Sequence, residues 1–105
     1  MIAGLEARLA EIKAQGQTIG YGDLARRLEI PGPGAIARLT AALEALMDED
    51  ARSGRPLRAA LCSGRLTGGM PATGFFQKAA ELGRDVSDPE GFVAAERAVL
   101  FKTQL

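Results

Sequence analysis

The chain has 105 residues, of which 47% are hydrophobic and 25% charged, a composition typical of one globular domain with a modest core. Thirteen basic side chains balance thirteen acidic ones, whereas dedicated nucleic-acid-binding domains are usually clearly basic. Histidine is absent and cysteine occurs once, which excludes a Ser-His-Asp triad, an internal disulfide and a zinc site of cysteine and histidine ligands. We therefore expect a non-enzymatic protein that holds no metal and no cofactor.

Hydrophobic residues are spread along the chain in short runs. None of these runs is long enough to cross a bilayer, so the sequence predicts no membrane contact. The opening segment MIAGLEARLAEIKAQ mixes charged and apolar residues where a signal peptide has an unbroken apolar stretch. We expect a cytoplasmic protein.

Helical periodicity begins near Ile2, and Gly16 ends this first amphipathic helix. A brief extended link at 18–20 leads to a second, short helix that begins at Tyr21. The prolines and glycines of residues 30–34 predict a turn, because proline disfavours helical geometry in the residue before it.

A longer third helix is expected from Gly34 to about Ala51. Three consecutive acidic residues at 48–50 lie near its C-terminal end, where they oppose the helix dipole, and the sequence suggests no stabilising role for them. The residues expected to face the core are Ile36, Leu39, Leu43, Leu46 and Met47.

The second half of the chain combines a small β element with two helices. Residues 57–66 predict a short strand, and residues 67–74 predict the tip and return of a hairpin. A helix is expected over 74–82, and the SDPE segment at 87–90 predicts the start of the last helix.

A helix, a helix-turn-helix and a β-wing in this order predict a winged-helix fold: mainly α, with a small β-hairpin. We expect a single domain over 1–105, with a winged helix-turn-helix core at 1–70 and two extra helices in a C-terminal extension at 71–105.

Two segments of the predicted helix-turn-helix, YGDLARRL from Tyr21 and GAIARLTAAL from Gly34, carry a resemblance to a known family. The first is similar to the TYG-x-LA helix, and the second to the recognition helix, of the C-terminal domain of alkylguanine-DNA alkyltransferases and alkyltransferase-like proteins. The resemblance implies that Tyr21 helps to turn out a nucleotide and that Arg38 fills the gap in the base stack. LCSGR places Cys62 where the family has its reactive cysteine, but Ser63 replaces the histidine that activates the thiolate, so we expect no alkyl transfer.

The segment GMPATGFFQKAAELG at 69–83 also resembles a pattern in bacterial winged-helix-like proteins of unknown activity. It implies no particular function.

The helix-turn-helix predicts a DNA-binding surface at the N-terminal end of the third helix. The outward face of this helix carries Arg38 followed by alanines and acidic residues, which offers little for reading base edges. The expected contacts are therefore to phosphates, through turn backbone and nearby arginines, and they predict weak, generic binding to double-stranded DNA. The predicted DNA-binding residues are Tyr21, Arg26, Arg27, Gly32, Gly34, Arg38, Arg55 and Arg65.

A protein-interaction surface is the alternative. Small residues at 37, 41 and 45 form a stripe along the third helix that allows another helix to approach closely, in a protein partner or a homodimer. Arginines gather around the predicted wing, but the acidic residues at 48–50 could neutralise them. Tyr21 also fits half-buried packing, and Cys62 also fits a small core position.

Overall fold

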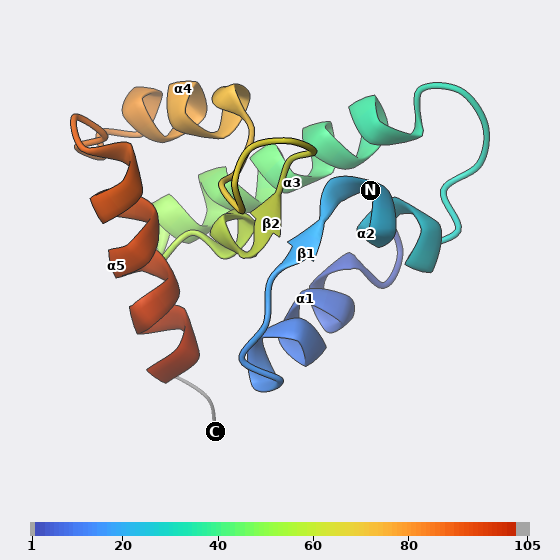
Figure 1. Ribbon diagram of the computed structural model, residues 1–105, viewed down its shortest axis with the longest axis horizontal. Helices are drawn as coiled ribbons and strands as arrows, with labels where there is room; N and C mark the ends of the chain where they lie inside the picture. The colour runs from blue at the N-terminus through green and yellow to red at the C-terminus, as the bar shows by residue number, and fades with distance from the viewer. Residues whose placement is uncertain (1, 103–105) are drawn as a thin grey trace.

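A computed structural model describes residues 2–102 (Figure 1). Over this part of the chain the protein is mainly helical with one small two-stranded sheet, which confirms the coarse fold prediction. The elements are, in chain order, α1 (Leu5–Ala14), β1 (Ile19–Gly20), α2 (Tyr21–Arg27), α3 (Ala35–Arg52), the 3₁₀ helix η1 (Arg58–Leu61), β2 (Cys62–Ser63), α4 (Thr73–Glu81) and α5 (Pro89–Lys102).

The helix α3 runs diagonally across the molecule, with α4 above it, α1 and α2 below it, and α5 beside its C-terminal end (Figure 1). Its predicted core face is confirmed from Leu39 onward, since Leu39, Leu43, Leu46 and Met47 are buried. The prediction for Ile36 is wrong, because this side chain is 46% exposed. The reason is that the core ends one turn short of the start of α3, at Leu39.

The connection between α2 and α3 covers residues 28–34 and arcs away from the rest of the molecule (Figure 1). It is longer than the roughly three- or four-residue turn of a helix-turn-helix motif. Gly34 caps α3 with a φ of 83°, a left-handed conformation that glycine adopts without steric penalty. Arg38 stabilises the turn, because its guanidinium donates hydrogen bonds to the carbonyl oxygens of Pro31 and Pro33.

The β element differs from the predicted hairpin. β1 pairs with β2 in a parallel arrangement, with Ile19 opposite Cys62 and Gly20 opposite Ser63. The strand predicted over 57–66 is wrong for most of its length, because residues 58–61 form η1. Residues 59–62 are buried in the centre of the core, and a short apolar run buried on all sides has no periodicity that separates a strand from a 3₁₀ helix. Residues 64–72 return as a loop without strand pairing.

Both predicted C-terminal helices are confirmed. α4 packs against α3, and Lys78 forms an ion pair with Asp48 at 2.9 Å. α5 contacts η1 and α1, and its Val93 and Leu100 belong to the same core as the N-terminal helices. The division of the domain at residue 70 stays a prediction. No helix among residues 2–102 is long and apolar enough to cross a membrane.

Candidate nucleic-acid interface

A groove of about 640 Å³ opens where β1, α2, the start of α3 and the loop after β2 come together. The parallel pairing of β1 with β2 creates it, because this pairing sets Gly20 opposite Ser63 and so brings the start of α2 beside the loop. Three of the predicted DNA-binding residues line the groove: Tyr21, Arg26 and Arg65. The remaining lining residues are Gly20, Gly22, Asp23, Ile36, Ser63 and Gly64.

Tyr21 forms part of the groove wall and is half-buried, as the packing interpretation predicted. Its hydroxyl oxygen accepts a hydrogen bond from the backbone N–H of Ala72 at 3.0 Å, which ties α2 to the segment before α4. Burial is the largest cause that raises the pKa of Tyr21, so the phenol is neutral at physiological pH.

Two cations lie on the groove itself, and they differ in their partners. Arg26 forms an ion pair with Asp23 one helical turn earlier, where both side chains are exposed. Arg65 is exposed and has no hydrogen bond or ion pair with any residue from 2 to 102. Arg65 is therefore the lining cation that is free to bind an anionic ligand.

Arg97 of α5 is a third cation near the groove, and it was not among the predicted DNA-binding residues. Its guanidinium donates to the carbonyl oxygens of Ala60 at 2.8 Å and Gly69 at 2.9 Å, and within the described chain no carboxylate pairs with it. It is close enough to Tyr21 and Cys62 to interact with both electrostatically. Burial lowers the pKa of Arg97, but an arginine remains charged at neutral pH.

The sequence did carry a signal for Arg97. It stands four residues after Val93 and three before Leu100, so it lies on the face of α5 that packs against the core. A charged residue on an apolar helix face requires polar partners, and here these are backbone carbonyl groups.

The other predicted residues lie outside the groove. Arg27 is exposed and has no partner within residues 2–102. Gly32 and Gly34 lie in the turn before α3, both with positive φ, and Arg38 bonds to that turn's carbonyl groups. To reach a phosphate, Arg38 would first have to release these two carbonyls.

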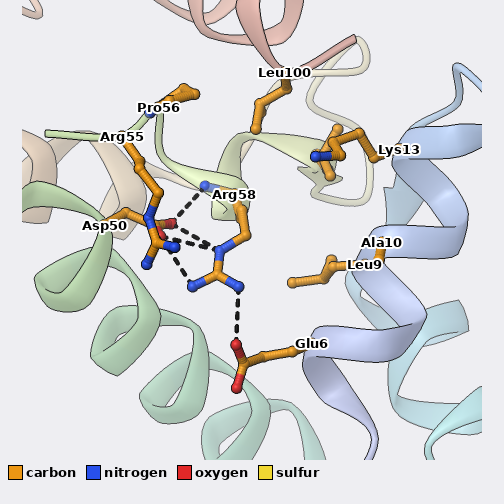
Figure 2. A pocket seen from close by; sticks show the side chains of 10 residues that line it. Glu6, Leu9, Ala10, Lys13, Asp50, Arg55, Pro56, Arg58 and Leu100 are labelled. Carbon is orange, nitrogen blue, oxygen red and sulfur yellow. Dashed lines mark hydrogen bonds and ion pairs between the residues drawn. The ribbon is translucent and has the colours of Figure 1, made fainter. Parts of the chain in front are cut away.

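Arg55 lines a different cavity of about 380 Å³, bordered by α1, η1 and α5 (Figure 2). Its guanidinium lies 3.4 Å from Asp50 and 3.6 Å from Glu49. The interpretation that the acidic run neutralises part of the arginine cluster is confirmed for Arg55. The expected gathering of basic residues around one wing is wrong, because Arg55 and Arg58 line this cavity and Arg65 lines the groove.

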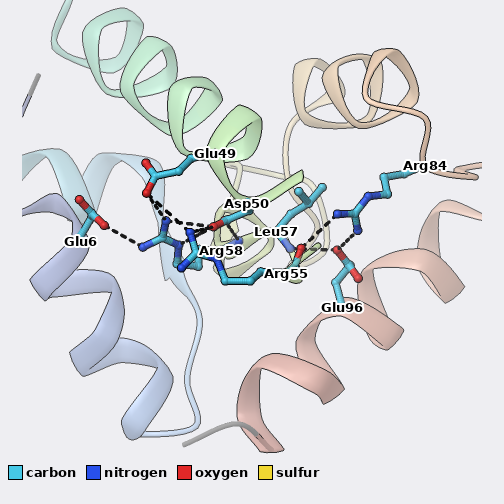
Figure 3. A network of polar contacts seen from close by, with 8 residues as sticks. All are labelled: Glu6, Glu49, Asp50, Arg55, Leu57, Arg58, Arg84 and Glu96. Carbon is cyan, nitrogen blue, oxygen red and sulfur yellow. Dashed lines mark hydrogen bonds and ion pairs between the residues drawn. The ribbon is translucent and has the colours of Figure 1, made fainter. Parts of the chain in front are cut away.

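Asp50 is fully buried. Figure 3 shows it at the centre of this second site, with Arg55 and Arg58 beside it. It accepts hydrogen bonds from the backbone N–H of Arg58 at 2.9 Å and from its Nε at 3.0 Å. Arg58 also donates to Glu6 of α1 at 3.0 Å. Burial alone would lower the pKa of Arg58, but the bonds to Asp50 and Glu6 outweigh it and raise the pKa. The cluster joins α1, α3 and η1.

Cys62 is a core residue with no exposed surface, as one interpretation of the sequence predicted. Burial raises the pKa of its thiol to about 12, and the positive charge of Arg97 only partly opposes this. At neutral pH the sulfur is a protonated thiol, which is a poor nucleophile. Residues 2–102 contain no group of three side chains that could hold a metal ion.

Comparisons with known proteins identify no relative of this chain. The sequence matches no protein-family model and no curated protein, and the fold matches no solved structure.

Proposed function

We propose that this protein binds double-stranded DNA, without enzymatic activity, through the groove beside α2 and the start of α3. The observation that carries the proposal is that Tyr21 and Arg26 of α2 and Arg65 of the loop after β2 line one concave surface. In this proposal the fold is a variant of the winged helix, in which α2 and α3 form the helix-turn-helix and the loop after β2 takes the place of the wing.

Charge supports an anionic ligand at this place. Among the described residues that line the groove, Arg26 and Arg65 are cations and only Asp23 is a carboxylate, and Arg97 bonds to the adjoining loop, although the whole chain is neutral. A local excess of positive charge attracts phosphate even on a protein with no net charge. The exposed arginine at position 27 is one further cation on α2.

The chemistry of α3 favours binding that does not depend on base sequence. Its exposed positions Ala37, Ala41 and Ala45 carry no hydrogen-bonding groups with which to read base edges. The similarity to alkyltransferase-like proteins supports a non-catalytic role, because Cys62 is buried and protonated.

The experiment is a fluorescence-anisotropy titration of a labelled generic duplex between about 50 and 200 mM salt. We expect saturable binding that weakens with salt, and Arg65→Ala should lower the slope of log K against log salt by about 1, the loss of one phosphate contact. Arg52→Ala is the matched control, since Arg52 is also exposed and unpaired within residues 2–102. It lies at the other end of α3, about 24 Å from Ile36 along the helix axis. No binding at low salt, or equal effects of both substitutions, would refute the proposal.

A protein-interaction surface is the second candidate, because the alanine positions 37, 41 and 45 form an exposed stripe of small apolar residues along one face of α3. A second copy of α3 could pack closely against it. Sedimentation equilibrium would then reveal a concentration-dependent dimer that Ala41→Glu dissociates. A dimer that Ala41→Glu dissociates, in a protein that does not bind DNA, would identify self-association through α3 as the function.

A further inference from the structure

The loop that follows β2 is a closed, hydrogen-bonded unit, which we call the Leu66 loop (residues 64–70). The N–H of Gly64 donates to the carbonyl oxygen of Met70 at 2.9 Å, and the N–H of Met70 donates to that of Thr67 at 3.2 Å. The Thr67 hydroxyl lies 2.8 Å from the carbonyl oxygen of Gly64. A side chain at position 64 would not fit, because its Cβ would lie 2.8 Å from the Thr67 methyl group. These contacts hold the loop in one shape.

Arg97 fixes the Leu66 loop to the body of the protein. Its guanidinium bridges the loop carbonyl of Gly69 and the η1 carbonyl of Ala60. The adjoining segment is held on another side by the bond from Ala72 to Tyr21. The loop is therefore a rigid rim of the groove, to which Gly64 and Arg65 contribute directly.

Leu66 stands out on this rim, because it is 99% exposed and has a φ of 61°. A left-handed backbone conformation is unfavourable for a bulky residue, and full exposure of a leucine yields no stabilising burial. Neither feature contributes to folding. Backbone strain that the surrounding contacts impose on an exposed apolar side chain is a feature of binding sites.

The neighbours of Leu66 select its partner. Arg65 precedes it in the chain, Arg97 donates to the carbonyl oxygen of Gly69 in the same loop, and residues 64–70 include no acidic residue, so the loop that carries Leu66 is associated with positive charge. A duplex presents the matching combination, with an anionic phosphate surface outside and apolar base faces inside. Proteins that bend DNA insert leucine and similar apolar side chains between base pairs in this way.

We propose that Leu66 is a wedge that enters the base stack of the DNA held at the groove, and that Arg97 is the residue that positions it. This inference rests on the proposed DNA binding. Insertion of Leu66 would partly unstack the two base pairs on either side of it. The hydrogen-bonded loop would keep its shape while the bases separate, so Leu66 would stay in position between them.

The test uses a short duplex with 2-aminopurine at its central steps, since this base fluoresces more strongly when it is unstacked. The full-length protein should raise the fluorescence as it binds. Leu66→Ala and Leu66→Gly should abolish the rise and weaken binding by about tenfold, which corresponds to about 1.4 kcal/mol. The salt slope should not change, because no phosphate contact is lost. Leu66→Met should restore the rise.

Val99→Ala is the matched control, because Val99 is an exposed apolar residue on α5 that does not line the groove. It should bind and unstack as the unmodified protein does. A fluorescence rise that survives Leu66→Ala, or duplex binding without any rise, would overturn the wedge and leave the DNA-binding proposal standing. Absence of duplex binding in anisotropy would overturn both.

Discussion

Removal of the buried charge at Asp50 should strongly destabilise the protein. Asp50→Asn keeps the size of the side chain but takes the carboxylate away from Arg58, whose backbone N–H and Nε donate to it at 2.9 and 3.0 Å. A hydrogen bond that involves a charged group is worth about 1.5–3 kcal/mol, and removal of one partner of a buried ion pair costs about 3–5 kcal/mol. Because Arg58 keeps its bond to Glu6, we expect the lower end, about 3 kcal/mol.

Thermal and urea unfolding followed by circular dichroism measure this effect. A loss of about 3 kcal/mol should lower the melting temperature of a chain of this length by about 12 °C. Asp48→Asn is the matched control. Asp48 lies two residues before Asp50 on α3, and its ion pair with Lys78 is partly exposed. We expect a much smaller shift for it, since surface ion pairs contribute little.

A double variant separates burial from pairing. Arg58→Met in the Asp50→Asn background removes the cation that the first change left without its buried partner, so it should restore part of the lost stability. Equal destabilisation by Asp50→Asn and Asp48→Asn would refute the reasoning, because it would mean that burial of the Asp50 carboxylate has no energetic consequence.

Three further outcomes follow from single residues. Leu66→Gly should raise the melting temperature by about 2–4 °C, because glycine removes the strain of the left-handed backbone, although it also increases the conformational entropy of the unfolded chain. A lower melting temperature would show that Leu66 supports the fold. Tyr21→Phe should lower the free energy of unfolding by about 1 kcal/mol, since it removes the acceptor of the Ala72 N–H, and an unchanged urea midpoint would contradict this. The buried Cys62 thiol has a pKa raised to about 12, so its contribution to stability is present below the unfolded value of about 8.5 and is lost as pH rises toward 12. Cys62→Ala should therefore reduce the fall in the urea midpoint over that pH range, and an unchanged fall would count against a buried thiol.

The amino-acid sequence by itself determined the helices α1 to α5 and their order, but not the 3₁₀ helix η1. Local signals were sufficient for this, because apolar spacing predicts an amphipathic helix, and glycine and proline mark where it ends. The turn at residues 30–34 and the two C-terminal helices were predicted on the same grounds and confirmed. The buried face of α3 was also predictable from Leu39 to Met47, since it depends only on the helical period.

The tertiary structure decided the features that depend on contacts between distant segments: the strand pairing, the groove and the partners of the acidic run. The parallel pairing of β1 with β2 joins positions more than forty residues apart, and no local pattern specifies that contact. That pairing brings Tyr21 and Arg65 to one groove, and it leaves Arg55 in another cavity. The acidic run at 48–50, which opposes the dipole of its own helix, acquires a role only through Arg58 and Lys78 from later elements. A charged group is stabilised by partners in space, and the sequence alone does not say where those partners lie.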